Sequence, residues 1–523
     1  MFDHSKKRYR LRVIIPAFPA FNIYSRVARV TTALGPVCVA TAVHEMVRWD
    51  VEVIDENNLR RHGPVHKDGG VDNDFLQSLR PADVVGLYGG LTSTIPRLYK
   101  IASYYKAKGV ITVVGGQHFV EETIPEALSS GVDYVVIGEG EETIRELLLA
   151  IEHGNEVSEI KGLAYIRNGN VFYTPPREPQ LDFDKLPIPD FSLVRYAKIK
   201  LYPVARIRGC GMDCEFCTVK GKPRYASSKR LLEQISYLVE TRDARQFFIV
   251  DDLFGQQREE TIKFCTMLRD YQKSTGIRLD LGVQIRLDKA KDAELLLAMR
   301  QCGINMIAIG YESPIEEELK AMSKRINSAD MLNLTKLYHK AGFLIHGMFI
   351  FGYPMPEGVS FRMSAGERVK RFRAFISKAR IDTIQVLMPG PLAGTELRKR
   401  LQKQNRVYPL EDIGWEYYDG NFSLFEPDEP MSAEEMQASA KKIMGRVYRF
   451  RNIVMLVVSI FSFPALLFFL NNLKLGWHTW YRPWRNRLIR FGGWIVMRGW
   501  TEAFKKDSYL EKLQSAKRRI KKT

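Results

Sequence analysis

The stretch VARIRGCGMDCEFC, residues 204–217, sets three cysteines, Cys210, Cys214 and Cys217, in one loop directly after an apolar, strand-like run. Thiolates are soft ligands that suit iron–sulfur clusters or zinc. Three thiolates can hold three irons of a cubane, which leaves the fourth iron open to a small molecule, whereas electron-transfer clusters ordinarily use four cysteines. The alternatives are a zinc site completed by a distant histidine, or unrelated buried thiols. Zinc sites usually show paired Cys-x2-Cys halves, which this loop lacks.

The remaining cysteines, Cys38, Cys265 and Cys302, are scattered through 523 residues. This is not a disulfide framework, and it favours a reducing compartment. The first ten residues, MFDHSKKRYR, lack the apolar core of a signal peptide, so we expect a cytoplasmic protein. Apolar residues make up 45% of the chain and charged residues 26%, as in globular proteins of two to four domains.

Strand-like runs alternate with helical patterns on the C-terminal side of the cysteines. The runs are VARIRG (204–209), FFIVDD (247–252), LDLGVQIR (279–286), MIAIGYE (306–312), GMFIFGYP (347–354) and TIQVLMPG (383–390). Six strand–helix repeats predict an incomplete (β/α)6 barrel over residues 199–400. Its functional groups are expected at the carboxyl ends of the strands.

A second α/β unit is predicted on the N-terminal side, over residues 1–175. Apolar runs at 11–16, 51–56, 84–89, 111–116 and 134–140 alternate with helical patterns, which predicts a Rossmann-like parallel sheet. Glycines at the strand ends let a ligand approach the backbone closely; the alternative is that they are turn glycines. Residues 175–190 hold five prolines and no periodicity, so residues 176–198 are expected to form a proline-rich linker.

The Cys-x3-Cys-x2-Cys spacing resembles the signature of the radical S-adenosylmethionine (SAM) superfamily. The resemblance implies a [4Fe–4S] cluster on Cys210, Cys214 and Cys217, with the amine and carboxylate of SAM on the open iron. It also implies an electron donor such as flavodoxin or ferredoxin, and cleavage of SAM to a 5′-deoxyadenosyl radical.

Further segments of the barrel resemble the SAM-binding segments of this superfamily in their order and spacing, although each alone is typical of a solvated loop. The resemblance implies that Phe216 contacts adenine, and that the strand ending at Asp251 and Asp252 lies near the SAM amine. The other implied contacts are Gln284 and Arg286 for the carboxylate or ribose, Glu312 and Ser313 for the ribose, and Gly352 for the adenine.

The N-terminal unit resembles the cobalamin-binding domain of the B12-dependent radical SAM class. The matching segments are GPVCVATAVHEM (35–46), GGLTST (89–94), VVGGQH (113–118) and GEGEET (138–143). The D-x-H-x-x-G pattern that supplies a cobalt-ligating histidine is absent, as it commonly is in this class. The implied cobalamin contacts are Thr92, Ser93, Thr94, Gly115, Gly116, His118, Gly138, Glu139 and Gly140.

Residues 401–523 are predicted to be mainly helical and carry most of the charge. From Lys441 to Thr523 there are 19 Lys/Arg and three acids, so this segment holds sixteen of the eighteen net positive charges. It also contains an uncharged apolar segment, 453–470, and five tryptophans among arginines: Trp477, Trp480, Trp484, Trp494 and Trp500. These features predict an anchor on a membrane surface. The alternatives are a packed hydrophobic helix and an RNA-binding tail, although an apolar run of this length does not suit RNA.

Together these resemblances imply a cobalamin-dependent radical SAM C-methyltransferase. Its expected substrate has an unactivated carbon and is hydrophobic: a lipid, an isoprenoid or a tetrapyrrole-like molecule. The expected location is the inner face of the cell membrane. The alternatives are a radical SAM cyclase, oxidase or carbon–carbon coupling enzyme, an RNA-modifying enzyme, and a non-catalytic membrane module that keeps the fold.

Overall fold

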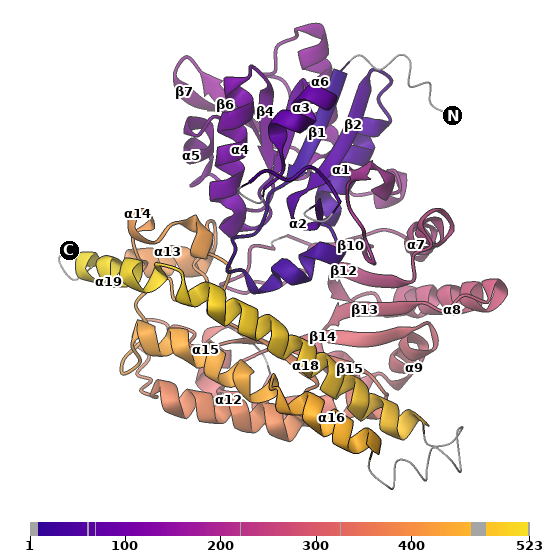
Figure 1. The fold of residues 1–523 in the computed structure, drawn as a ribbon, viewed down its shortest axis with the longest axis vertical. Coiled ribbons are helices and arrows are strands. Elements are labelled where there is room, and N and C mark those ends of the chain that lie inside the picture. Colours follow the sequence, from indigo (N-terminus) through magenta and orange to yellow (C-terminus); the bar gives the residue numbers. More distant parts are fainter. Residues whose placement is uncertain are drawn as a thin grey trace.

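The computed structural model describes residues 9–59, 62–67, 70–219, 221–324, 326–461 and 477–520. Two sheets organise this part of the chain, with the N-terminal sheet at the top of Figure 1 and the C-terminal helices along its lower edge. The N-terminal sheet has the strand order β7-β6-β5-β4-β3-β1-β2-β8. Its strands are β1 (Tyr9–Ile15), β2 (Trp49–Asp55), β3 (Val84–Tyr88), β4 (Ile111–Gly115), β5 (Tyr134–Val136), β6 (Leu163–Arg167), β7 (Asn170–Tyr173) and β8 (Val194–Arg195).

Helices cover both faces of this sheet because its central strands are apolar on both sides. On β1, Val13 packs into one buried cluster and Ile14 into another, as the two-residue period of a strand requires. Helices α1 (Leu34–His44) and α6 (Gly140–His153) lie together against one face, and α4 (Ile95–Ala107) contacts β3 and β4. The parallel core β2-β1-β3-β4-β5 confirms the predicted Rossmann-like unit.

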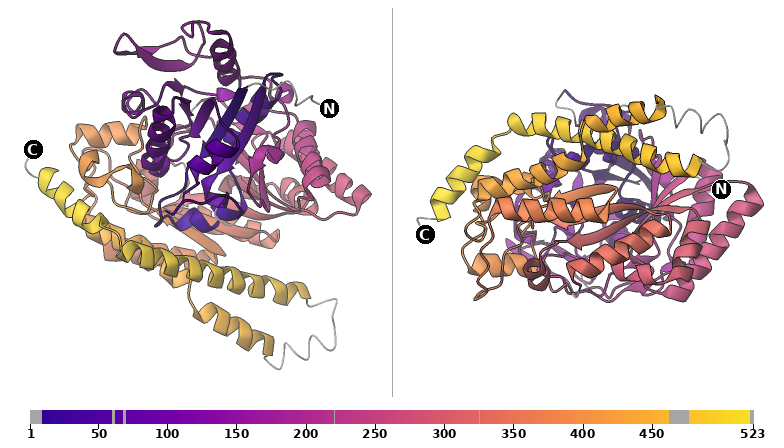
Figure 2. Two further views of the ribbon diagram at one scale, coloured as in Figure 1. Left: turned by 45° about the horizontal axis from the view of Figure 1, so that its top comes forward. Right: turned by 90° about the horizontal axis from the view of Figure 1, so that it is seen from below.

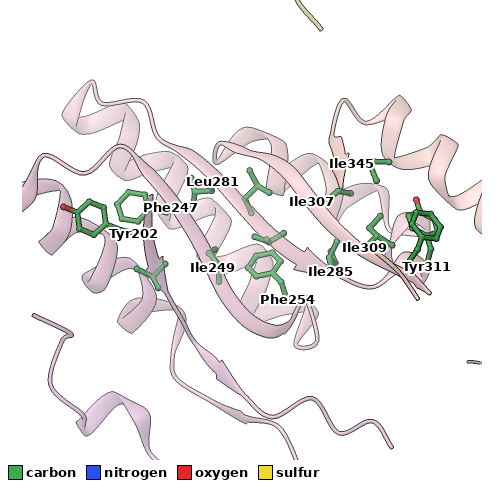
Figure 3. Packing of buried hydrophobic residues seen from close by; sticks show 14 of the residues in the cluster. Tyr202, Phe247, Ile249, Phe254, Leu281, Ile285, Ile307, Ile309, Tyr311 and Ile345 are labelled. Carbon is green, nitrogen blue, oxygen red and sulfur yellow. The ribbon is translucent and has the colours of Figure 1, made fainter. Parts of the chain in front are cut away.

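The second sheet confirms the predicted partial barrel. Six parallel strands follow one another in the order β16-β15-β14-β13-β12-β9. They are β9 (Leu201–Val204), β12 (Gln246–Phe254), β13 (Asp280–Ile285), β14 (Ile304–Glu312), β15 (Leu344–Ile350) and β16 (Thr383–Leu387). The intervening helices include α7 (Ser228–Arg242), α8 (Arg258–Thr275), α9 (Ala293–Gln301), α11 (Ser328–Lys340) and α12 (Ala365–Ala379). Side chains such as Phe247, Ile249 and Leu281 form the buried layer of this barrel (Figure 3).

Two segments differ from the simplest expectation. The run VARIRG is not one strand: β9 ends at Val204, and Ile207–Arg208 forms a separate strand, β10, that pairs antiparallel with β11 (Arg224–Tyr225). Within residues 176–198, β8 pairs with β2 and forms one edge of the N-terminal sheet, with Val194 opposite Val53. Since Val194 is buried, the expected linker is tied to the N-terminal sheet rather than free of it.

The C-terminal region is helical in the described residues. It comprises α15 (Ala433–Val447), α16 (Arg451–Phe461), α18 (Trp477–Lys505) and α19 (Tyr509–Ile520). Helix α18 is fixed to the barrel, since Arg490 Nε donates to the carbonyl of Asp382 at 2.7 Å. The left view of Figure 2 shows α16 and α18 side by side at the lower edge of the molecule.

The predicted membrane segment is described only in part. Residues 453–461 lie in α16, and 462–470 are outside the described residues. Among the described helices, none combines the length and apolar character needed to cross a bilayer. The side chains of Trp477 and Trp480 also lie outside the described set. Trp500 is buried and stacks on Phe504 at 5.5 Å, so its side chain belongs to the packed part of the C-terminal region.

Candidate functional site

The three cysteines lie in the loop that β10 and β11 close. Arg208 pairs with Arg224 across these two short strands, so the ends of the loop are held together. Cys210, Cys214 and Cys217 are all half-buried, and the amide of Cys217 donates to the carbonyl of Cys214 at 3.1 Å. The loop therefore presents its thiols from a short, folded-back segment at the carboxyl end of β9.

Two neighbouring aspartates at the end of β12 hold the segment that leads into this loop. Oδ1 of Asp251 accepts from the amides of Arg206 and Ile207 at 2.6 and 2.8 Å, and Oδ2 of Asp252 accepts from the amide of Gly209 at 2.6 Å. Burial raises the pKa of Asp251 to about 6, although these hydrogen bonds oppose the shift. Burial also raises the pKa of Asp252.

Both aspartates were expected near the SAM amine, but their side chains lie on different sides of β12. Asp251 is 2% exposed and engaged with backbone amides, so its role is to position the loop. Asp252 points to the opposite side of β12, where it lines a pocket with Phe248 and Val250. This division could have been read from the two-residue period of the strand.

Two glutamine side chains also lie close to backbone carbonyls of the cysteine loop and of β12. Gln256 Nε2 donates to the carbonyl of Cys210 at 2.8 Å, a contact that the sequence analysis did not anticipate. Only its position shortly after the Asp-Asp pair could have indicated it. Gln284 Nε2 lies 3.4 Å from the carbonyl of Asp252.

Two other residues predicted to contact SAM, Arg286 and Glu312, each form an ion pair. Arg286 pairs with Asp288 at 2.9 Å and lies 3.4 Å from Sδ of Met212, so it reaches the cysteine loop. Glu312 adopts a positive φ of 59° and pairs with Lys324 at 3.0 Å near the end of its strand.

Ser313 does not share this setting. It is completely buried, and its hydroxyl donates to Glu318 and accepts from the amide of Ile315. Glu318 also forms a buried ion pair with Arg368 at 2.6 Å. The structure therefore places the Ser313 side chain in a buried polar network behind the strand end, and its contact with the ribose stays a prediction.

The Cys214–Cys217 segment is anchored to the far side of the barrel. The ring of Phe216 meets the edge of Tyr353 with centroids 6.0 Å apart. Glu215 accepts from the hydroxyl of Tyr353 at 2.5 Å and from Nε of Arg400 at 2.6 Å. Gly352 has a φ of 77°, and a Cβ there would lie 3.0 Å from Met431. A side chain at this position would therefore crowd the ends of the methionines packed after β15.

A pocket of about 870 Å³ lies between the two sheets and beside the loop. This volume is near the upper end of the range for ligand pockets, roughly 300–1,000 Å³. Five of the predicted cobalamin contacts line it: Gly115, Gly116, Gly138, Glu139 and Gly140. The barrel contributes Asp252, Arg208 and the inward-facing side chains of β12. A Cβ on Gly138, whose φ is 84°, would meet nothing within 4 Å, so the pocket floor is open there.

The remaining predicted cobalamin contacts lie behind this pocket. Thr92, Ser93 and Thr94 are buried and are not among the lining residues, nor is His118. Nδ1 of His118 lies 3.3 Å from Oγ1 of Thr92, and its ring packs against Trp415 at 4.9 Å. Burial, reinforced by the charge of Arg398, lowers the pKa of His118 to about 4. The position of this histidine does not support a contact with the corrin.

Glu139 connects the pocket to the cysteine loop. It accepts from Arg208 at 3.1 Å and from Arg224 at 2.9 Å, and both guanidinium groups lie over the ring of Phe183. Burial alone would raise the pKa of Glu139, but the hydrogen bond from Arg224 and the charges of both arginines outweigh it and lower the pKa. The strands that close the loop are thus ion-paired to the N-terminal unit.

The donor set fits an iron–sulfur cluster. Cys265 and Cys302 are buried on neighbouring segments of the barrel wall, and Cys38 lines the pocket, where burial raises its thiol pKa to about 12. Only the loop therefore offers three thiols together. No group of three candidate ligands in the described residues is placed to hold a single metal ion. A cubane does not require three ligands around one ion, since each thiolate binds a different iron.

Two family models match the chain. The B12 binding domain matches residues 23–148, and the radical SAM superfamily matches residues 204–363. These domains, with the pocket between them, define an enzyme class that combines cobalamin with radical SAM chemistry. An uncharacterized methyltransferase of Pyrococcus horikoshii is 30% identical over 397 residues, 71% of this chain and 80% of the relative. The chain belongs to this family of B12-binding radical SAM enzymes, and its cofactors are a [4Fe–4S] cluster, SAM and cobalamin.

More distant relatives share about half of the chain. The hopanoid C-2 methylase of Rhodopseudomonas palustris is 27% identical and covers 53% of this chain and 50% of its own. The anaerobic magnesium-protoporphyrin IX monomethyl ester cyclase of Rubrivivax gelatinosus is 26% identical, and the match covers 53% of this chain and 52% of the cyclase. Among solved structures, the cobalamin-dependent SAM radical enzyme OxsB aligns with a TM-score of 0.61 at 13% identity over 98% of this chain and 84% of its own. The last likeness shows that the fold is shared.

Proposed function

We propose that this enzyme is a C-methyltransferase that acts on an unactivated carbon of a hydrophobic substrate. The observation that carries the proposal is the shared pocket, since the strand ends of the cobalamin-binding domain and the mouth of the barrel face the same space. Groups bound by the two domains can therefore act on one substrate held between them. When bound, the cluster with SAM supplies one-electron chemistry able to remove a hydrogen atom from an unactivated carbon, and cobalamin supplies a methyl group.

The residues of the chain contribute position and shielding rather than acid–base chemistry. Asp251, Asp252 and Gln256 hold the backbone on the N-terminal side of the loop, while Glu215 anchors its C-terminal side. Side chains such as Val113, Phe248 and Met306 make much of the pocket wall apolar. An apolar wall excludes water, which protects reactive species from side reactions.

The hydrophobic character of the substrate rests on the pocket wall and on the relatives. Methylation of a hopanoid and cyclisation of a magnesium-protoporphyrin ester are the reactions named for two proteins that share about half of this chain. We extend only the common property, a large apolar substrate, to this protein. A lipid, an isoprenoid or a tetrapyrrole-like molecule meets that requirement.

We also propose that the protein works at the inner face of the cell membrane. Helix α16 supports this, since its side chains are mainly apolar and Leu456 is the only buried residue among its eleven. A substrate that lives in a bilayer could then be reached without full transfer into water.

The test supplies SAM with an isotopically labelled methyl group to the anaerobically reconstituted enzyme, together with cobalamin, reduced flavodoxin as electron donor and a membrane-lipid extract of a deletion strain. We expect the label in a lipid that is one methylene lighter in the deletion strain than in the parent. The Cys214→Ala protein is the control and should transfer no label. Label that stays in water-soluble products would contradict the proposal.

The second candidate is a radical cyclase or oxidase, and the cyclase among the relatives favours it. The same experiment separates the two functions. A cyclase or oxidase would change the mass of the substrate through loss of hydrogen or gain of oxygen, without incorporating the labelled methyl group.

A further inference from the structure

A second pocket, distant from the cysteine loop, lies where α11, α12, α15 and α18 meet. Its volume is about 1460 Å³, and we call it the basic pocket. Eight of its lining residues are cationic: Lys336, Arg373, Lys378, Arg380, Arg446, Arg449, Arg487 and Arg490. Asp382 is the one carboxylate among the lining residues, and it already accepts from Asn486 and from the amide of Ile345.

Some cations of the basic pocket are held in place by hydrogen bonds, and others at its rim have no acidic partner in the described part of the chain. Arg490 is fixed by its bonds to the carbonyls of Ile381 and Asp382 at 2.8 and 2.7 Å. At the rim, Arg446, Arg449 and Lys378 form no salt bridge within the described residues. Like charges so close together repel one another, and burial with the charges of Arg446 and Arg373 lowers the pKa of Arg449. Such a cluster is suited to an anion with several oxygen acceptors.

An exposed apolar stripe begins at the edge of this pocket. Arg449 lines the pocket, and α16 starts two residues later. Phe450, Val454, Val457, Val458 and Phe461 recur at helical spacing, and they are exposed, up to 55% for Val458 and 76% for Phe461. Arg487 Nη1 donates to the carbonyl of Met455 at 2.9 Å, so the stripe and the pocket belong to one packed unit of α16 and α18 (Figure 2).

We propose that the basic pocket binds the phosphate group of an anionic phospholipid while the stripe on α16 enters the acyl region beneath it. The charge of the pocket is complementary to a phosphodiester, and the neighbouring apolar stripe matches the part of the lipid that a soluble phosphate lacks. RNA would satisfy the cations but would leave the stripe in water. The inference deepens the membrane location proposed above and rests on it, but it does not depend on methyl transfer.

The experiment measures partition of the reconstituted full chain onto vesicles of phosphatidylglycerol with phosphatidylcholine, and onto phosphatidylcholine alone. We expect tight partition onto the anionic vesicles that weakens with salt. Arg446→Gln/Arg449→Gln should weaken it about 30-fold, because each basic side chain near an anionic surface favours binding and the effects multiply. Lys336→Gln/Lys378→Gln provides a second test of the same pocket. Lys273→Gln/Lys291→Gln on the barrel wall, with the same loss of charge, should partition as the parent does.

The stripe is tested separately by Val458→Ser/Phe461→Ser, which should weaken partition onto both kinds of vesicle.

Equal partition of the parent and both pocket variants onto anionic vesicles would overturn the pocket while leaving the membrane location intact. A parent that binds neither vesicle would overturn both. If inorganic phosphate occupies the pocket at concentrations that leave vesicle binding unchanged, the pocket binds a soluble anion. If the parent binds RNA but not vesicles, and the pocket variants lose the RNA binding, the pocket binds RNA. Either result would overturn the lipid assignment.

Discussion

Glu139 of the cobalamin-binding domain pairs with Arg224 of the strand that closes the cysteine loop, at 2.9 Å. Glu139 lies at the N-terminal end of α6 and lines the large pocket, whereas Arg224 follows the loop by a few residues. The two domains are thus joined by a half-buried ion pair at the point where their cofactor sites meet. Opening this contact would separate the loop from the pocket.

Replacing Glu139 with glutamine tests this connection. We expect Glu139→Gln to lower the free energy of unfolding by about 1–3 kcal/mol, because Arg208 and Arg224 lose their shared charge partner in a partly desolvated site. We also expect weaker cobalamin retention on gel filtration. Glu142→Gln is the matched control, since Glu142 is exposed and lies 3.5 Å from Arg177. Equal stability and retention in the two variants would show that the pair is not structural.

The three loop cysteines should act as one unit. Cys214→Ala is expected to lose the cluster, because a cubane needs a thiolate on each of three irons. Cys265→Ala and Cys302→Ala should keep it, since both residues are buried in the barrel wall. Iron content and visible absorbance after anaerobic reconstitution measure this. Loss of iron from Cys265→Ala as complete as from Cys214→Ala would refute the ligand assignment.

Asp251 should matter through the loop rather than through SAM. Asp251→Ala leaves the amides of Arg206 and Ile207 without their acceptor, and each buried unpaired amide costs about 1–3 kcal/mol. Asp251→Asn keeps one oxygen acceptor and should be milder. We expect iron retention to fall in the order parent, Asn, Ala, while the Kd for SAM of the fraction that retains iron stays near the parent value. A large loss of SAM affinity with full iron would instead indicate direct contact.

His118 predicts a defined pH dependence. Its folded-state pKa of about 4 lies below the ordinary value of 6.5, so its contribution to stability is complete above pH 6.5 and is lost as the pH falls toward 4. Relative to His118→Phe, the parent should lose up to about 3 kcal/mol of unfolding free energy over this range. Urea unfolding at several pH values measures the difference. The exposed His153, replaced in the same way, should show a much smaller effect.

Gly352 and Gly358 separate crowding from backbone strain. Both have a positive φ, 77° and 80°, but a Cβ would meet Met431 and Met436 only at Gly352. We expect Gly358→Ala to cost about 1–2 kcal/mol for the left-handed conformation alone. Gly352→Ala should cost about 2–4 kcal/mol because packing adds to the strain. Urea unfolding of both variants provides the comparison, and equal costs would show that the methionines move aside freely.

The sequence alone determined the chemistry and the order of the domains. Spacing within 210–217 identifies a three-thiolate loop because neighbouring residues stay close in any fold. The strand–helix alternation predicts both sheets because burial on two faces requires apolar runs of that length. The glycines at 115, 116, 138 and 140 follow strand-like runs, and they lie at the pocket because strand ends in a parallel sheet converge on one edge. Their contact with cobalamin stays a prediction.

Tertiary structure decided which of the predicted side chains face that edge. Asp251 and Asp252 are neighbours in sequence but lie on opposite sides of β12, and Ser313 and His118 turn into buried polar or aromatic surroundings. The pairing of Glu139 with Arg224 depends on contacts between residues far apart in the chain. So does the gathering of eight cations, six from four helices and two from the residues that follow α12 and α15. Sequence periodicity specifies which face of an element is buried, but the partner that covers that face is fixed only when the elements pack together.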